Sequence, residues 1–461
     1  MCLKCADPAS RLYFQLMSPR GIVHALAAVG VLCFCAGGRP EARDSAIEMD
    51  RAFQKFWAAP TPSKATKIAK DIVATGIGFD EALRRLKIGR PYLPQKTGII
   101  NLRNKTADGM VHYYTVKVPD GYDPTRRYQV RFQLHGGVDE RPDKQQRGEA
   151  EIGRLAGAEQ IYVIPYAWND APWWSEDQIL NLRAILDALK RSYNIDENRV
   201  VVAGVSDGGT GAYYLAMRDT TPFASFLPLN ASIMVLGHEG LDLNERIFPN
   251  NLRNKPLLVV NGGQDQLYPT SEVEPYIEHM KNNGVAIDYH PQPTAGHDTT
   301  WWPGLRDTFE RFVTEHRRDP LPDTLTWEMA EGDAYNRAHW LMIDQLDPQP
   351  EDAQQQLFNV NRFNLGTASV TPWPLFAYKP PAGRVDLVRT GNTITATTEG
   401  VSGFTLLLSP DQFDFTQPVK LVVNERLVLD SRIQLSVATL LKWAALDNDR
   451  TMLFGAELHV R

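Results

Sequence analysis

The sequence predicts an α/β fold, in which helices cover both faces of a mostly parallel sheet, followed by a smaller β-rich domain. Strand and helix patterns alternate from Tyr92 to about Arg318, an order typical of parallel strands joined by helical crossovers. After Pro320 and Pro322, short strand patterns predominate. At 461 residues the chain is also too long for one ordinary core. We therefore expect a signal peptide over 1–38, a helical lead-in over 39–95, an α/β domain over 96–320 and a β-rich domain over 321–461.

The apolar run Gly21 to Gly38 follows Arg20 and is short and rich in glycine, as in the hydrophobic part of a secretory signal. Cleavage near Ala36 to Arg39 would remove all four cysteines and exclude both disulfides and thiol catalysis. We expect a secreted or periplasmic protein with no stable membrane span after cleavage. A lipid anchor is the less favoured alternative, because Phe34 precedes Cys35 where lipoprotein signals carry small residues.

The individual elements follow from hydrophobic periodicity. The lead-in is helical from Ser45 to about Gly89, with Phe53, Phe56 and Trp57 on one face, and we expect it to pack on the α/β domain. The α/β domain carries strand patterns at 111–118, 128–134, 160–165, 199–205 and 257–260, and helical patterns at 179–189, 271–281 and 304–316. The β-rich domain carries strand patterns at 384–398 around a Gly-Asn turn, at 404–408, 419–423 and 451–460, and a helix near 435–446.

Composition narrows the function classes. A hydrophobic share of 43% and a charged share of 23% exclude a disordered or fibrous chain, and a net charge of -6 gives no reason to expect nucleic acid as a partner. The histidines are scattered rather than spaced as metal ligands, and no glycine-rich phosphate-binding loop ends in Lys-Ser or Lys-Thr. We therefore expect no metal and no cofactor.

The run from Arg199 to Gly209 indicates a nucleophilic serine at the end of a buried strand. Three consecutive valines suit a central parallel strand that is covered on both faces. The following Gly204-Val205-Ser206-Asp207-Gly208 has the pattern of a sharp strand-to-helix turn, in which the flanking glycines let strand and helix cross closely. We expect Ser206 to be the nucleophile.

A serine hydroxyl needs an imidazole to accept its proton and a carboxylate to orient that imidazole. Asp265 follows the strand pattern 257–260, and His297 follows a short apolar segment, so both fall in loops after strands and in the order Ser, Asp, His. Asp298 is the rival acid. We prefer Asp265, because a side chain adjacent in sequence to His297 would have to fold back on it.

Acyl transfer also needs donors for the developing oxyanion, usually two backbone N–H groups. One should come from Asp207, which follows the nucleophile, and the other from Gly137 in the loop Leu134-His135-Gly136-Gly137. Gly136 or Val138 would serve instead if the register differs by one residue. His135 is expected to brace this loop rather than to act chemically.

Tryptophans cluster next to these loops. Trp168 and Trp173 follow the strand pattern 160–165, with Trp174 beside them, and Trp301 and Trp302 follow His297. We assign Trp168, Trp173 and Trp301 to the walls of a substrate pocket, with packing of the loops as the equal alternative.

From Tyr113 to Glu315 the chain resembles the α/β-hydrolase superfamily, and most of all the esterases related to polyhydroxyalkanoate depolymerases and feruloyl esterases, and the catalytic domain of prolyl oligopeptidases. The resemblance rests on the Leu134 to Gly137 loop, the serine turn, and the Asp265 and Gly296-His297 loops. It implies a triad of Ser206, Asp265 and His297 with oxyanion donors at Gly137 and Asp207.

Three features depart from these families. A carboxylate stands beside the nucleophile, the insert between Leu229 and Pro256 is too short for a large lid, and no β-propeller precedes the domain. The resemblance implies a serine esterase that acts on a small-molecule or polymer-linked ester. The alternatives are a serine peptidase of prolyl oligopeptidase type, or a non-catalytic protein that binds a glycan or polymer on a hydrolase scaffold.

Overall fold

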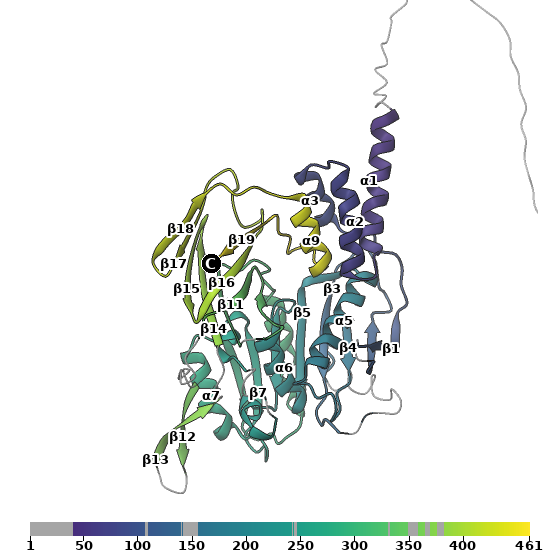
Figure 1. Ribbon diagram of the computed structural model, residues 1–461. Coiled ribbons are helices and arrows are strands. Elements are labelled where there is room, and N and C mark those ends of the chain that lie inside the picture. The colour runs from purple at the N-terminus through teal and green to yellow at the C-terminus, as the bar shows by residue number, and fades with distance from the viewer. Residues whose placement is uncertain are drawn as a thin grey trace, which may run out of the picture. The chain divides into compact units, whose positions relative to one another are not determined.

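The computed structural model describes residues 40–106, 109–139, 141, 155–241, 243, 247–330, 332–348, 358–364, 369–375 and 382–461 (Figure 1). Residues 49–461 form a compact unit, to which the features below belong, apart from the start of the first helix. The expected signal peptide lies outside the described residues. Within the described ranges, no helix is both long enough and apolar enough to cross a membrane.

The α/β region is built on a mostly parallel sheet of eight strands, as the sequence predicts. Their order is β1-β2-β4-β3-β5-β6-β7-β8; β2 is antiparallel to both of its neighbours, and the strands from β4 to β8 run parallel. The bounds are β1 Gly98–Lys105, β2 Val111–Val118, β3 Tyr128–Leu134, β4 Ile161–Pro165, β5 Ile195–Val205, β6 Ser225–Leu229, β7 Leu257–Gly262 and β8 Ile287–Gln292. Strands β1 and β6 have no counterpart among the predicted elements.

Helices cover both faces of this sheet. On β5, Val200 and Val202 face the core that contains α5 (Glu176–Ser192), α6 (Asp207–Arg218) and α7 (Thr270–Asn282). The alternate residues Val201 and Ala203 face a second core, with α8 (Trp302–Glu315). Because side chains alternate along a strand, the continuous apolar run of β5 is buried on both sides.

The β-rich region forms two sheets around one core of its own (Figure 1). One sheet has the order β18-β17-β15-β14-β9 and the other β10-β11-β16-β19. Their bounds are β9 Thr324–Ala330, β10 Arg337–Ala338, β11 Leu341–Leu346, β14 Ala382–Thr390, β15 Thr393–Glu399, β16 Val401–Leu408, β17 Val419–Val423, β18 Arg426–Ser431 and β19 Ala456–Val460, with α9 at Val437–Asp447. A separate hairpin, β12 (Phe358–Asn364) and β13 (Ser369–Leu375), lies with β12 against α7.

The lead-in is helical as expected, but its packing partner is not the expected one. It forms α1 (Pro40–Ala58), α2 (Pro62–Ala74) and α3 (Phe79–Ile88). Phe53, Phe56 and Ile72 lie in a core with Leu440 and Leu441 of α9, rather than in a core of the eight-stranded sheet. An apolar helix face shows that a partner exists but does not identify the partner.

Asparagine side chains connect the two regions along one edge of β9. The short helix η4 (Pro249–Asn254) lies beside β9, the outer strand of its sheet. Asn251 donates to the carbonyl of Glu328 and accepts from its N–H, and Asn254 does the same with Thr326. The amides thus occupy hydrogen-bonding positions that a further strand would fill.

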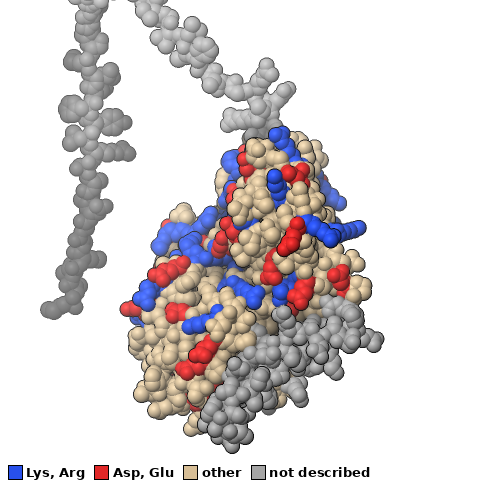
Figure 2. All heavy atoms as spheres, turned by 90° about the vertical axis from the view of Figure 1, so that its left-hand side faces the viewer, with Lys and Arg blue, Asp and Glu red and all other residues tan. Residues whose placement is uncertain are grey.

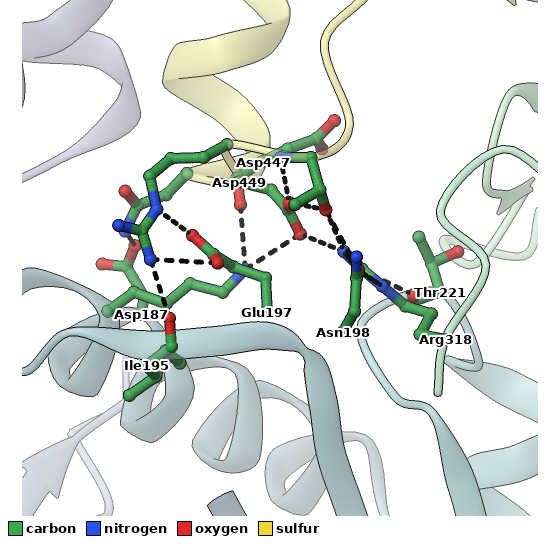
Figure 3. Close-up of polar contacts among 12 residues, drawn as sticks. Asp187, Ile195, Glu197, Asn198, Thr221, Arg318, Asp447 and Asp449 are labelled. Carbon is green, nitrogen blue, oxygen red and sulfur yellow. Dashed lines mark hydrogen bonds and ion pairs between the residues drawn. The ribbon is translucent and has the colours of Figure 1, made fainter. Parts of the chain in front are cut away.

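A buried ionic network connects the base of β5 to the segment 447–451 (Figure 3). Arg450 forms two bonds with Glu197, at 2.5 and 3.0 Å, and Arg318 binds Asp449 at 2.7 Å. Lys190 of α5 lies 3.5 Å from the same Asp449 carboxylate. Burial alone would raise the pKa of Asp449, but Arg318, Lys190 and the hydrogen bonds from Thr451 together outweigh burial and hold that pKa below its ordinary value.

On the face drawn in Figure 2, basic and acidic side chains of the described residues intermingle. This distribution agrees with the modest net charge of -6. The surface in this view therefore offers no broad field of one sign to attract a polyanion.

Candidate active site

Ser206 lies in a strained turn between β5 and α6. Its backbone has φ 55° and ψ -119°, outside the regions that most residues occupy. A Cβ on Gly204 would lie 2.0 Å from the carbonyl oxygen of Gly208, and one on Gly208 would lie 2.2 Å from that of Leu134. The expected need for glycine at both positions is therefore confirmed. The neighbouring strand β6 helps to hold this turn, since the Ser206 N–H donates to the carbonyl of Leu229 at 2.8 Å.

The three residues of the expected triad lie together in one line of hydrogen bonds. His297 Nε2 is 2.9 Å from Ser206 Oγ, and His297 Nδ1 is 2.7 Å from Asp265 Oδ2. The Asp265 side chain is fully buried, whereas the His297 side chain is 27% exposed. A buried carboxylate fixes the imidazole tautomer with a proton on Nδ1, so that Nε2 can accept a proton from the serine.

Asp265 is itself held in place by the loop that follows β7. Its Oδ1 accepts the backbone N–H groups of Leu267 and Tyr268, at 2.8 and 3.0 Å. Oδ2 is left for His297. These two amides compensate the buried charge of the carboxylate.

The rival acid is excluded by its orientation. Asp298 Oδ1 accepts the backbone N–H and the hydroxyl of Thr300, at 2.9 and 2.5 Å. These bonds lower the pKa of Asp298, with the bond from the Thr300 hydroxyl as the largest cause. Asp298 therefore stabilises its own exposed turn, as Asp residues commonly do, and does not orient His297.

The loop after β3 passes close to Ser206. A Cβ on Gly136 would lie 2.9 Å from the Ser206 Cβ, so only glycine permits this approach. Gly137 has φ 69°. His135 braces the loop as expected, because its Nε2 accepts the Ala167 N–H at 3.1 Å.

Asp207 does not point into solvent. Its Oδ2 accepts the backbone N–H of Val138 at 2.9 Å. This bond occupies the Val138 amide, which the sequence left open as an oxyanion donor. Asp207 is the first residue of α6, and the first hydrogen bonds of this helix run from the Gly209 and Thr210 N–H groups to the Ser206 carbonyl, so the Asp207 N–H precedes them.

The tryptophans assigned to the walls of a substrate pocket are buried. Trp168, Trp173 and Trp301 are 2%, 2% and 7% exposed, which favours packing of the loops over the walls of a pocket. Trp173 donates to the carbonyl of His135 at 2.9 Å, and the Trp301 ring packs against Trp302 and Phe309. They support the loops from behind, the alternative that the sequence left open.

Tyr268 is a site residue that the sequence analysis missed. Its ring meets the His297 ring edge to face, with centroids 5.8 Å apart. Burial, followed by the nearby carboxylates of Asp207 and Asp265, raises the pKa of Tyr268 and keeps its hydroxyl neutral. Its position three residues after Asp265 was the available signal.

The strand order, with β2 antiparallel and the nucleophile turn between β5 and α6, decides the class of this region. The fold is that of an α/β-hydrolase. In the part of the chain that the structure describes, no group of three His, Cys, Asp or Glu side chains is placed to hold a metal ion.

Comparisons with known proteins give distant similarities to this α/β-hydrolase fold. No family model matches the chain. A curated relative, described as a probable feruloyl esterase C of Aspergillus terreus, is 27% identical over 190 residues. The match covers 40% of this chain and 66% of that relative, just under two thirds of the relative's length.

Solved structures are similar over about half of the chain. A ferulic acid esterase is 21% identical, with 48% of this chain and 99% of that chain covered and a TM-score of 0.37. S-formylglutathione hydrolase from Staphylococcus aureus is 17% identical, with 49% and 98% covered and a TM-score of 0.35. Dipeptidyl peptidase 4 from Porphyromonas gingivalis is 14% identical, with 49% and 36% covered and a TM-score of 0.37.

Proposed function

We propose that the protein is a serine hydrolase that cleaves carboxylic esters through an acyl-enzyme on Ser206. The observation that carries the proposal is the continuous line from Ser206 Oγ to His297 Nε2 and from His297 Nδ1 to Asp265 Oδ2. A line with these distances supplies a nucleophile, a general base and an orienting acid.

In the first half of the reaction, Ser206 Oγ attacks the ester carbonyl carbon while His297 Nε2 takes its proton. The carbonyl π electrons move onto oxygen, and the N–H groups of Gly137 and Asp207 stabilise this oxyanion. Asp265 remains ionised and stabilises the imidazolium. The tetrahedral intermediate then expels the alcohol, which takes the proton from His297.

In the second half, water replaces the alcohol. His297 removes a proton from the water, the resulting hydroxide attacks the acyl carbonyl, and the same donors bind the second oxyanion. Collapse of this intermediate breaks the bond to Ser206 Oγ, which regains its proton from His297. The carboxylic acid leaves and the site returns to its starting state.

The two alternatives make different demands on the site. A non-catalytic binding protein requires no intact triad, so the complete hydrogen-bonded line supports an enzyme instead. A serine peptidase would use the same triad and would differ in the amine that it releases. We favour the ester because the curated relative is described as a feruloyl esterase.

We also propose the division of labour along the chain. Residues 96–320 carry catalysis, residues 321–461 support this domain or hold a polymer to which the ester is attached, and residues 1–38 direct export to the periplasm or the medium. Deleting the β-rich domain is a poor test of its role, because α1 to α3 share a core with α9.

The proposal is tested by steady-state hydrolysis of p-nitrophenyl acetate, methyl ferulate and a dipeptide p-nitroanilide. We expect ester hydrolysis, and a fall in kcat of at least about 10³-fold in Ser206→Ala. The matched control is Ser225→Ala, which removes a buried serine from the opposite end of the neighbouring strand β6. An equal ester rate in wild type and Ser206→Ala would overturn the proposal, and faster cleavage of the anilide would indicate a peptidase.

A further inference from the structure

The carboxylate of Asp207 joins the two segments that supply the oxyanion donors. Asp207 is the first residue of α6 and directly follows the nucleophile, whereas Val138 directly follows Gly137. The bond from the Val138 N–H to Asp207 Oδ2, at 2.9 Å, therefore links the start of α6 to the loop after β3. Asp207, whose own N–H is one of the two proposed oxyanion donors, thus also holds Val138, the residue next to the other proposed donor, Gly137.

The loop after β3 needs such a link because its middle is flexible by composition. His135 is fixed at the β3 end, where its carbonyl accepts Trp173 Nε1 and its Nε2 accepts the Ala167 N–H. The next two residues are glycines, and glycine has the widest range of backbone angles. Beyond them, the Asn169 N–H donates to the Asp139 carbonyl at 2.9 Å. The Asp207 bond acts between these ends, on the peptide that joins Gly137 to Val138.

We propose that Asp207 is a positioning residue: its carboxylate binds the Val138 N–H and thereby restrains the backbone of Gly137, so that the N–H of the Gly136–Gly137 peptide, and not the Val138 N–H, faces the oxyanion. This inference rests on the proposed function. A second amide turned toward the substrate would bind the ground-state carbonyl in an altered position, whereas a fixed loop directs its donor to the site where charge develops. The effect belongs to the transition state and so to kcat.

The negative charge of Asp207 does not contradict this role. A carboxylate near a developing oxyanion would repel it if both were unscreened. Here one carboxylate oxygen accepts the Val138 N–H, and the group lies at the N-terminus of α6, where the helix dipole favours negative charge. Asp207 therefore satisfies the loop amide while its charge is offset by the helix.

A simpler role for Asp207 would be stabilisation of the helix N-terminus alone. That role depends on the charge of the side chain, whereas the proposed role depends on a side chain long enough to bring an acceptor oxygen to the Val138 N–H. Asparagine lacks the charge but retains a carbonyl oxygen at the same distance from the backbone. The two roles therefore predict different behaviour for Asp207→Asn.

The experiment compares wild type with Asp207→Asn, Asp207→Ala and Asp139→Ala on p-nitrophenyl acetate, with Tm measured for each protein. We expect Asp207→Ala to lower kcat by about 10- to 100-fold with KM changed by less than about 3-fold, because one oxyanion donor is displaced. Asp207→Asn should retain kcat within about 5-fold because its amide oxygen can accept the Val138 N–H. Asp139→Ala removes an exposed carboxylate from the same loop and should leave kcat within about 2-fold.

A second readout uses benzeneboronic acid, which forms a tetrahedral adduct on a nucleophilic serine. Its inhibition constant should rise in Asp207→Ala by about the same factor as kcat falls, because both depend on the oxyanion donors. If Asp207→Ala does not fold, Asp207→Ser replaces it, since serine suits a helix N-terminus and is too short to reach Val138.

Wild-type kcat in Asp207→Ala, or equal losses in the Asn and Ala variants, would overturn the inference. These outcomes are distinct from failure of the proposed function, which would appear as ester hydrolysis that survives in Ser206→Ala.

Discussion

Two aspartates, Asp265 and Asp298, are candidates to orient His297, and their hydrogen bonds distinguish them. Asp265 receives two backbone N–H groups on one oxygen and presents the other to the imidazole. Asp298 is exposed and bound to Thr300. Orientation, rather than closeness in sequence, therefore favours Asp265 as the proposed acid.

This assignment predicts opposite results for two matched amide substitutions. Asp265→Asn should lower kcat by about 10⁴-fold, because the amide favours the wrong imidazole tautomer while the geometry is preserved. Asp298→Asn should leave kcat within about 2-fold, because it alters only an exposed turn. Steady-state kinetics with circular dichroism as a folding check measures both. A larger loss in Asp298→Asn would reverse the assignment.

The sequence could locate Ser206, Asp265 and His297 because each follows a strand pattern, and parallel strands bring their carboxyl ends to one edge. The sequence could not decide whether the tryptophans line a pocket or pack the loops, since burial of a ring depends on elements far away in the chain. The sequence also could not predict the hydrogen-bond partner of the Asp207 side chain, because that partner, Val138, lies in another loop. Contacts between loops are set by tertiary packing, which periodicity does not describe.

At the scale of elements, β9 shows how an outer strand is protected by side chains. Asn251 is fully buried and makes three bonds, to the Met217 carbonyl and to both backbone groups of Glu328. The five-stranded sheet of the β-rich region thus meets the α/β region through amides instead of a sixth strand. Such a cover also prevents pairing with a second chain.

We expect Asn251→Ala to lower the free energy of unfolding by about 3 kcal/mol, because it leaves buried backbone groups without partners. Asn250→Ala is the matched control, since Asn250 binds only a side-chain oxygen of the half-buried Glu328 among the described contacts and should cost about 1 kcal/mol. Urea denaturation followed by tryptophan fluorescence measures the difference. Equal costs for the two variants would show that β9 does not depend on these amides.

The sequence predicted most elements because their apolar patterns are strong. Strands β2 and β3 have the predicted bounds, and α7, α8 and α9 agree within two residues. Strand β1, Gly98–Lys105, was missed because half of its residues are polar and most of its side chains are exposed. The predicted packing partner of α1 to α3 was also wrong, because the actual partner, α9, lies more than 300 residues away in the sequence.

At the scale of the whole molecule, a buried ionic network joins β5 to residues 447–451 (Figure 3). Arg450 and Glu197 are 7% and 3% exposed. A buried pair gains little over an apolar pair, but one charge without its partner is costly. Packing of the segment 447–451 against β5 therefore depends on the presence of both Arg450 and Glu197.

We expect Arg450→Met to lower the free energy of unfolding by about 3 to 5 kcal/mol, because Glu197 is left buried and charged. The double variant Arg450→Met with Glu197→Gln should recover at least about 1 kcal/mol of this loss. Chemical denaturation of the four proteins of this cycle measures the coupling. A double variant as unstable as the sum of the single variants would contradict a coupled pair.

His339 gives the junction of the two regions a dependence on pH. It is buried, and its Nδ1 lies 3.0 Å from the Pro320 carbonyl. Burial, followed by the positive charges of Lys255 and Arg318, lowers the pKa of His339 well below its ordinary value. The unfolded chain therefore takes up a proton at higher pH than the folded protein does. The stability from this group is present above about pH 6.5 and is lost as the pH falls below it.

We expect the wild-type Tm to fall between pH 7.5 and pH 5, and to fall less in His339→Asn. The substitution removes the titrating group, and Asn tolerates the φ of 51° at this position. One proton contributes at most about 1.4 kcal/mol per pH unit. Differential scanning fluorimetry across this range gives both curves, and parallel curves would remove His339 as a source of acid sensitivity.

We propose that Ser206 is an activated nucleophile held by His297 and Asp265. Intact-protein mass spectrometry after treatment with a fluorophosphonate, followed by peptide mapping, tests this role. We expect one adduct per chain, on the peptide that contains Ser206, and no adduct in Ser206→Ala or after His297→Ala within the same reaction time. An unlabelled wild-type protein, or labelling that persists in Ser206→Ala, would contradict it.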